Sequence, residues 1–212
     1  MNDLTMMLVI HDAFRRDLRR LGAALRDGGA PARSGALLER WEWLVDQLHH
    51  HHTGEDRWLW PALREHVASR PDAVTVLAEM EQEHQRLEPP QQAFDAALRA
   101  FAADPDAARA AAAAAVLAPF ATEVDRHLDH EERDAVPLLE HELPAVVLRR
   151  FSARQQRTMG PRPAMTRFFP WLLDEAPPER SRRVLGELPA PLRMVVRRSV
   201  PSYARAVAPA WD

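Results

Sequence analysis

Residues 51–61, HHTGEDRWLWP, and residues 127–137, HLDHEERDAVP, carry one pattern twice. In each copy a His is followed four residues later by a Glu, and a Pro stands six residues after the Glu. Four residues make about one turn of an α-helix, so the His and the Glu project from the same face. Cations bind well to an imidazole and a carboxylate held at fixed spacing on a rigid element. Two copies predict two helices that converge on one metal site.

The apolar residues before each copy indicate that this helix face is buried. Leu44 and Leu48 precede the first copy, and Phe120 and Val124 precede the second, with the steps of three and four of an inward bundle face. The His and Glu of each copy continue these series at positions where the pattern favours Leu. An ionised carboxylate buried there must be paired, protonated or bound to a metal, because its uncompensated burial is very costly.

Two further histidines fit the same analysis. His11 lies in the apolar stripe of the N-terminal segment, and His84 lies in that of the third helical segment. Six nitrogen and oxygen ligands without a thiol favour iron or manganese, with zinc as an alternative. The candidate metal ligands are therefore His11, His51, Glu55, His84, His127 and Glu131.

The composition limits the classes of protein to which this chain can belong. Its 212 residues suffice for one domain with an appendage. The absence of Cys excludes disulfides, iron–sulfur clusters and thiolate zinc sites. No apolar run approaches the roughly 20 residues of a membrane span. The N-terminus shows no signal-peptide pattern, so we expect a cytoplasmic protein without a membrane partner.

Charge divides the chain into two parts. Residues 1–144 carry 15 Arg against 26 Asp and Glu, whereas residues 145–212 carry 13 Arg against 5 acids. A basic tail can bind nucleic acid, but this one also holds apolar residues such as Phe169 and Trp171. We therefore expect the tail to fold back on the acidic part rather than to bind nucleic acid. The predicted units are a metal-binding bundle over 1–143 and a basic helical extension over 144–212.

Turn residues divide the chain into helices, and no segment has the alternating pattern of a strand. We expect bundle helices over 3–26 and 34–69, a third from Pro71, and a fourth from a cap at Asp104 to about 143. Pro89 and Pro90 are expected to interrupt the third helix, and Pro61 and Pro137 to bend the other two. Shorter helices are expected over 145–158, 164–175 and 179–206. The predicted fold class is all-α, an antiparallel up-down four-helix bundle with additional C-terminal helices.

The order His, His-x-x-x-Glu, His, His-x-x-x-Glu over four helices resembles the hemerythrin-like (HHE cation-binding) family. The strings around His11 (IHDAF), His51 (HHTGED) and His127 (HLDHEE) carry this resemblance, together with Glu83-His84. It covers residues 1 to about 143 and implies two irons in the bundle core. His11 and His51 would then hold one iron, and His84 and His127 the other. Glu55 and Glu131 would bridge the two.

The third helix departs from the oxygen-carrying hemerythrins, which have a second His one turn from the first. Here Met80 and Glu88 lie one turn from His84. Met80 is a poor ligand for iron, and Glu88 could serve as an additional ligand although Pro89 follows it. A missing ligand leaves an open metal position, as catalytic sites do. Reversible oxygen carriage is thereby less favoured than redox chemistry or sensing.

The remaining histidines are expected on the surface or behind the ligands. His49 to His52 are contiguous, and the Pro spacing shared with the second copy selects His51 as the ligand of this run. The expected non-ligands are His49, His50, His52, His66, His130 and His141.

The sequence thus predicts a di-iron protein that binds or reacts with O₂ or a related small molecule such as peroxide or NO, with an electron donor that it does not identify. One alternative is an oxygen- or iron-responsive regulatory module that signals through the C-terminal extension. The other is an O₂-dependent oxidoreductase in which this extension covers a pocket for an organic substrate.

Overall fold

A computed structural model describes residues 2–212, which are almost entirely helical and contain no strand. The first part of the chain forms α1 (Thr5–Arg26), a short 3-10 turn η1 (Ala30–Arg33), α2 (Ser34–Gly54), the π-helical turn η2 (Glu55–Leu59), α3 (Trp60–His66), α4 (Pro71–Ala103), α5 (Ala107–His130), the π-helical turn η3 (Glu131–Ala135) and α6 (Val136–His141). The C-terminal part forms α7 (Ala145–Met159), α8 (Pro161–Pro163), the π-helical turn η4 (Ala164–Phe168), α9 (Phe169–Leu173), α10 (Pro178–Gly186) and α11 (Ala190–Trp211).

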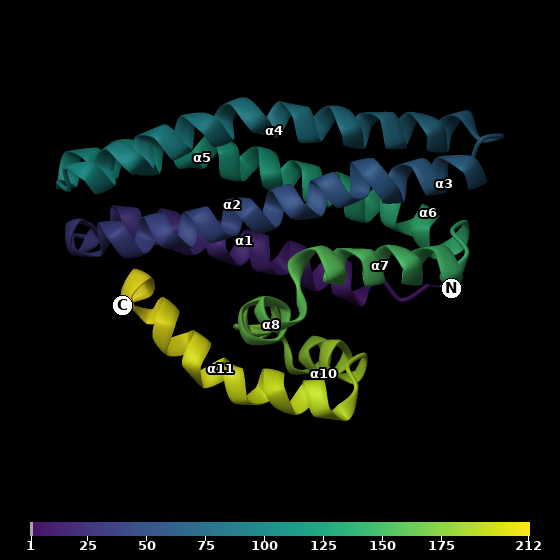
Figure 1. Ribbon diagram of the computed structural model, residues 1–212. Helices are drawn as coiled ribbons and strands as arrows, with labels where there is room; N and C mark the ends of the chain where they lie inside the picture. The colour runs from purple at the N-terminus through teal and green to yellow at the C-terminus, as the bar shows by residue number, and fades with distance from the viewer. Residues whose placement is uncertain (1) are drawn as a thin grey trace.

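The first six helices make the predicted all-α, four-helix bundle. The runs α2–η2–α3 and α5–η3–α6 each act as one long helix, and they lie beside α1 and α4 (Figure 1). Trp41 is fully buried at the centre, with its ring edge against Phe94 and Phe120 at centroid distances of 4.6 and 5.6 Å. Three helices therefore meet at one aromatic cluster, which fixes their relative rotation.

The two expected helix bends are π-helical turns, and each one begins at the Glu of the repeated pattern. The backbone N–H of Trp60 bonds to the carbonyl of Glu55, five residues back, and Val136 does the same with Glu131. A proline, here Pro61, crowds the carbonyl four residues before it and has no N–H to donate. The wider turn relieves this crowding, which explains why Pro follows each Glu at the same distance.

The expected interruption of the third helix at Pro89 and Pro90 was wrong, because α4 runs without a break from Pro71 to Ala103. Each proline costs about 3 kcal/mol in a helix interior. The carbonyls that lose their partners belong to Gln85 and Arg86, both exposed, so water can hydrogen-bond to them. The helix beyond the prolines is held on the bundle by buried side chains, namely Phe94, Leu98 and Phe101.

Two other boundaries differ from the prediction. The side chain of Asp106 accepts a hydrogen bond from the backbone N–H of Arg109 at 2.7 Å, so Asp106 rather than Asp104 caps α5. The single helix expected over 179–206 is divided into α10 and α11 after Gly186. Pro189 precedes α11 with an extended backbone, and Gly before and Pro after a break are common at helix ends.

The C-terminal helices pack against α1 and α2 and share one hydrophobic core with the bundle. Figure 1 shows α7 alongside the bundle, and α8, α10 and α11 beneath it. Trp171 is fully buried, with its ring 5.5 Å from that of Phe14. Its Nε1 also donates a hydrogen bond to the buried carboxylate of Asp17 at 2.9 Å. Apolar contact and this hydrogen bond hold the tail on the bundle.

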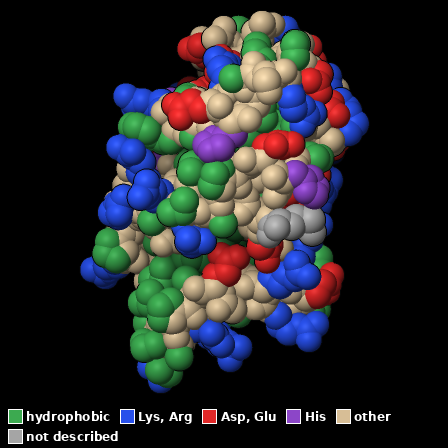
Figure 2. Space-filling model, turned by 90° about the vertical axis from the view of Figure 1, so that its right-hand side faces the viewer, with side chains coloured by type: hydrophobic (Ala, Val, Ile, Leu, Met, Phe, Trp, Pro, Cys, Tyr) green, Lys and Arg blue, Asp and Glu red, His purple; other side chains and the backbone are tan. Residues whose placement is uncertain are grey.

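Charge alone does not explain the position of the tail. Arg180 of the basic tail pairs with Asp12 of the bundle, but Arg20 of the bundle also pairs with the tail acids Asp174 and Glu175. Apolar residues remain exposed on the first half of α11, and Figure 2 shows hydrophobic side chains gathered at the lower end of the molecule, where the C-terminal helices lie.

The segment Ala107–His141 is long and apolar enough to cross a membrane by length and composition alone. Ala supplies much of this hydropathy, so the segment contradicts the expectation that no apolar run approaches the length of a membrane span. Inside the bundle the same segment carries the fully buried His127 and Glu131. Core helices of soluble proteins pass the same test, so this segment does not establish a membrane location.

Candidate metal centre

The four bundle helices each bring one of the predicted histidines to a common point. Nε2 of His11 on α1 lies 3.1 Å from Nε2 of His51 on α2. Nε2 of His84 on α4 lies at the same distance from Nε2 of His127 on α5. Two nitrogens that each bind one cation at about 2.1 Å, at roughly a right angle, would be about 3 Å apart. Both pairs therefore have the spacing of two ligands on one ion.

The two glutamates lie between the histidine pairs. Glu55 places Oε1 3.2 Å from Nε2 of His51 and Oε2 3.7 Å from Nε2 of His84. Glu131 places Oε2 3.3 Å from Nε2 of His11 and 3.8 Å from Nε2 of His127. Each carboxylate thus faces one His of each pair, as a carboxylate that bridges two cations would.

The carboxylate oxygens of Glu55 and Glu131 show that the cluster fits a cation. Both side chains are fully buried, and all four oxygens lack a hydrogen-bond partner among residues 2–212. A histidine pair without metal could share one N–H between its two Nε2 atoms. That arrangement would still leave two buried carboxylates without donors, at a cost of several kcal/mol each. Positive ions between the carboxylates would remove this cost.

Three acidic residues next to candidate ligands accept hydrogen bonds from histidine Nδ1 atoms, which face away from the centre of the cluster. Glu132, directly after Glu131, accepts from Nδ1 of His11 at 2.9 Å. Asp56, directly after Glu55, accepts from Nδ1 of His84 at 2.8 Å. Each copy of the pattern therefore supplies a central Glu and, next to it, the acid that orients a His on a neighbouring helix.

His127, on the fourth bundle helix, has an equivalent partner in Glu83, which lies on α4. Its Oε2 accepts from Nδ1 of His127 at 3.0 Å, and its Oε1 accepts from Arg126 at 2.8 Å and His130 at 3.1 Å. Burial opposes ionisation, but these hydrogen bonds lower the pKa of Glu83 to about 2. An ionised carboxylate on Nδ1 leaves the lone pair of Nε2 free for a metal.

Burial prepares the ligands for metal binding at neutral pH. The pKa of His51 lies well below 6.5, first because of burial and then because of neighbouring histidines, and burial also lowers the pKa of His127. Burial and then the nearby Glu131 and Asp56 raise the pKa of Glu55 well above 4.5. Neutral imidazoles can coordinate a metal directly. The carboxyl of Glu55 needs a cation beside it to offset the free-energy cost of a buried negative charge.

His52 belongs to the cluster, although the sequence analysis placed it among the non-ligands. Its ring stacks on that of His84 at 4.0 Å, and its buried Nε2 has no hydrogen-bond partner within residues 2–212. His52, His84 and His127 form one group of converging ligand atoms, and His11, His51 and Glu131 form another. His51, which the Pro spacing selected, also lies in the cluster, since neighbours on a helix can both face inward where three helices meet.

The other expected non-ligands lie outside the cluster. His130 contacts Glu83, as described, and His66 bonds to the carbonyl of Ala62 on its own helix at 2.9 Å. Met80 is buried in an apolar cluster. The exposed Glu88 accepts a hydrogen bond from Gln92 at 2.9 Å, on a helix that Pro89 leaves intact.

A polar cavity leads to one side of the centre. It has a volume of about 320 Å³ and lies between α2 and α4. His52, His84 and Asp56 of the histidine cluster line it, together with Glu88 and Gln92. A small polar molecule can therefore approach the His52 side of the cluster.

Comparison with known proteins gives one match. The model of the hemerythrin HHE cation binding domain matches residues 2–139, which is well over half of the chain. No curated protein and no solved structure matches the chain.

Proposed function

This chain belongs to the hemerythrin HHE cation-binding domain family, and from this premise we propose that its buried His–Glu cluster is a non-haem di-iron centre that binds or reacts with O₂ or a related small molecule such as peroxide or NO. The observation that carries the proposal is the pair of buried carboxylates, Glu55 and Glu131, between two histidine pairs and without hydrogen-bond donors.

The proposed ligands divide into two sets around the shared carboxylates. His11 and His51 would hold one ion, and His84, His127 and His52 the other. His52 would add a nitrogen to the set that contains His84, where the third helix has Met80 one turn before His84. If Glu55 and Glu131 served both ions, the ion at His11 and His51 would have fewer protein ligands than the other and would be the one left with a position for a small molecule.

Nitrogen and oxygen ligands without thiolates favour iron or manganese, with zinc as an alternative, and the family resemblance selects iron for this proposal. Bound iron supplies the electrons that reduction of O₂ or peroxide requires. The protein residues fix the positions of the ligands and shield most of them from solvent, since His11, His127 and both glutamates are fully buried. Glu132, Asp56 and Glu83 keep the protons of three imidazoles on Nδ1.

The first test is metal identity and stoichiometry after anaerobic loading with Fe(II) and desalting. Two irons per chain are expected. O₂ is then admitted and removed while the absorption spectrum is followed. A band that appears and disappears reversibly supports binding, and irreversible oxidation supports an oxidase, peroxidase or NO-handling role. Absence of bound metal, or loaded protein without any spectral response, would overturn the proposal.

A second candidate function is an O₂-dependent oxidoreductase that acts on an organic molecule. It is favoured by a mainly apolar cavity that the C-terminal helices close over His51. Such an enzyme would also need an electron donor. Consumption of O₂ that depends on an added organic substrate would distinguish this function from reversible binding.

A further inference from the structure

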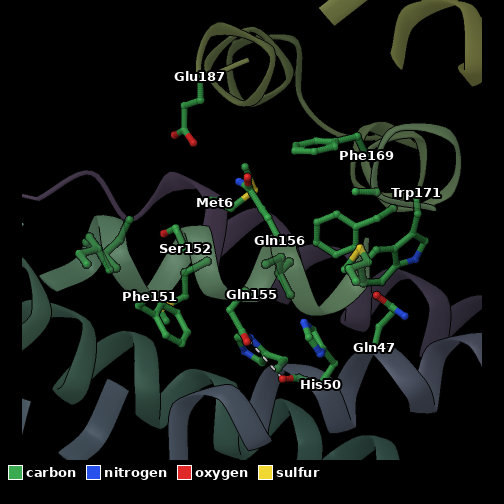
Figure 3. Close-up of a pocket in the computed structure, with 18 of the residues that line it drawn as sticks. Met6, Gln47, His50, Phe151, Ser152, Gln155, Gln156, Phe169, Trp171 and Glu187 are labelled. Atoms are coloured by element: carbon green, nitrogen blue, oxygen red, sulfur yellow. Dashed lines mark hydrogen bonds between the residues drawn. The ribbon is translucent and has the colours of Figure 1, made fainter. Parts of the chain in front are cut away.

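A partly open cavity lies between the bundle and the C-terminal helices. Its volume is about 140 Å³. Met6 and Phe14 come from α1, Phe151 from α7, and Phe169 and Trp171 from α9. Figure 3 shows the labelled Met6, Phe151, Phe169 and Trp171 around this space, which the polar Gln156 and Glu187 also line. The cavity exists only because the extension folds onto the bundle.

His51 connects this cavity to the candidate metal centre, because it lines the cavity while its Nε2 lies in the histidine cluster. The Nδ1 atoms of His11, His84 and His127 are each hydrogen-bonded to a carboxylate, whereas Nδ1 of His51 is not, in the part of the chain that the structure describes. The only carboxylate within residues 2–212 that contacts the His51 ring is Glu55, on the Nε2 side. When Nε2 binds a metal, Nδ1 carries a proton and can donate it in a hydrogen bond.

Gln47 provides a second polar atom one turn before His51 on α2. It is 5 % exposed and lines the cavity, and its Nε2 donates to Asp46 at 2.9 Å. Its Oε1 is buried and has no hydrogen-bond partner within residues 2–212. Residues four apart are neighbours on a helix surface, so one bound group can reach both side chains. An acceptor without a donor in an apolar wall indicates a missing partner.

We propose that this cavity binds a small apolar molecule, about the size of one aromatic ring, that carries a hydroxyl group. The hydroxyl would accept a hydrogen bond from Nδ1–H of His51 and donate one to Oε1 of Gln47. The volume supports a single ring, since an engineered apolar cavity of about 150 Å³ in another protein holds benzene. The proposal rests on the proposed metal centre only for the position of the proton on His51.

The α7 helix covers the cavity next to the proposed metal ligands. The amide of Gln155 lies against Gly54, where a Cβ atom would come within 3 Å of it, and Nε2 of Gln155 donates to the carbonyl of His50 at 3.3 Å. Figure 3 marks this hydrogen bond at the lower end of the cavity. The extension therefore covers the helix that carries His51 through a contact that only Gly54 permits without displacement.

The test compares phenol with toluene, which has nearly the same shape but no hydroxyl. Both are titrated into the full-length, metal-loaded protein by calorimetry, with protein-free and bovine-albumin titrations for non-specific uptake. Phenol is expected to bind saturably, about tenfold more tightly than toluene, which corresponds to about 1.4 kcal/mol for the added hydrogen bonds. Equal affinities, or no saturable binding of phenol, would overturn the proposal.

Two variants locate the binding site. Gln47→Leu keeps the size of the side chain and should bring the affinity for phenol closer to that for toluene, because only the hydrogen bond from His51 remains, with toluene unchanged. Ser152→Trp, at an exposed position on the cavity rim, should abolish binding of both probes. Ala153→Trp is the matched control, because Ala153 is exposed on the same helix but does not line the cavity. Equal effects of the two Trp variants would place phenol elsewhere and contradict the proposal.

Glu131→Ala separates this proposal from the proposed function, since Glu131 does not line the cavity. Loss of metal from this variant with phenol binding retained supports both. Wild-type protein that binds no metal but binds phenol would overturn the metal proposal alone. Wild-type protein that binds two metals but no phenol would overturn the cavity proposal alone.

Discussion

Oε2 of Glu131 lies 3.3 Å from Nε2 of His11, and both side chains are fully buried although they belong to opposite ends of the bundle sequence. No hydrogen-bond donor within residues 2–212 serves this carboxylate. A proton shared with His11 would satisfy at most one of its oxygens. The first prediction follows from this contact.

Substitution of a proposed ligand should remove metal without loss of the fold. Glu131→Ala, Glu55→Ala and His11→Ala are each expected to reduce the metal content of loaded protein from two ions to one or none, as measured by elemental analysis. His66→Ala is the control, since within residues 2–212 this exposed His hydrogen-bonds only to the carbonyl of Ala62 on its own helix. Full metal content in all three ligand variants would rule out the proposed centre.

Glu55→Gln distinguishes a metal ligand from a structural residue. The amide has no charge to bury, so the metal-free variant should be more stable than the metal-free wild type by about 1–3 kcal/mol at pH 8. Metal content should fall at the same time. Chemical denaturation and elemental analysis on the same samples provide both values. A less stable metal-free variant would mean that Glu55 makes a favourable contact in the absence of metal.

His52→Ala should weaken one of the two ions only, because His52 groups with His84 and His127 and not with His11. The expected result is a titration with one tight and one weakened site. His49→Ala is the matched control on the same helix, since the one hydrogen bond of the His49 side chain within residues 2–212 is to Thr53, at 3.4 Å. Two unchanged sites in His52→Ala would return this residue to the non-ligands that the sequence analysis proposed.

Glu83→Gln tests the support behind His127. The ionised carboxylate orients this imidazole and holds its proton on Nδ1, so its loss should lower metal affinity about 10–100-fold. Competition with a chelator of known affinity measures the change. Glu79→Gln, on the same helix, should have little effect because Glu79 only approaches His130, at 3.7 Å. Equal affinities of the two variants would contradict this role for Glu83.

The stability of the metal-free protein should fall as the pH is lowered from 7.5 to 5.5. The pKa values of His51, His52 and His127 are lowered by burial, so the unfolded chain takes up their protons first, and stability is lost below about pH 6.5. Glu55 acts in the opposite direction. Its raised pKa gives stability at low pH that is lost as the pH rises through that value.

The three histidines outweigh Glu55 between pH 5.5 and 7.5, so the stability of the metal-free protein should increase with pH over this range. Thermal unfolding at pH 7.5, 6.5 and 5.5 measures it, and His66→Ala should show the same slope as the wild type. A midpoint that rises toward pH 5.5 would show that Glu55 dominates.

The position of the C-terminal extension depends on Asp17. This carboxylate is 1 % exposed and accepts hydrogen bonds from Arg16, Arg40 and Trp171 at 2.8–2.9 Å. Asp17→Ala leaves two buried guanidinium groups without their anion, and about 3–5 kcal/mol of unfolding free energy should be lost. Proteolysis near residue 175 should become faster.

Asp174→Ala is the control for Asp17→Ala. Its carboxylate is partly exposed, and its pairing with Arg20 should contribute at most about 1 kcal/mol. If both variants lose the same stability, the buried network around Asp17 does not hold the extension.

Much of the bundle was predictable because its signals are local. The four-residue spacing of His and Glu fixes one helix face, and the apolar series around His11 and His84 selects the inward side of the other helices. All six predicted ligands lie in one cluster for this reason. The error at Pro89 arose because the cost of a proline can be estimated from the sequence, whereas the packing that outweighs this cost cannot.

Helix periodicity depends only on residues a few positions apart, so the amino-acid order was enough to predict the inward stripe of each helix. The packing of the helices sets three features that lie beyond that stripe: His52 joins His84 and His127, Asp56 and Glu83 hold histidines of neighbouring helices, and Gln47 and His51 line a cavity under the extension. These relations depend on how helices rotate and pack against each other. That rotation is set by side chains such as Trp41 and Trp171, whose partners are far away in the chain.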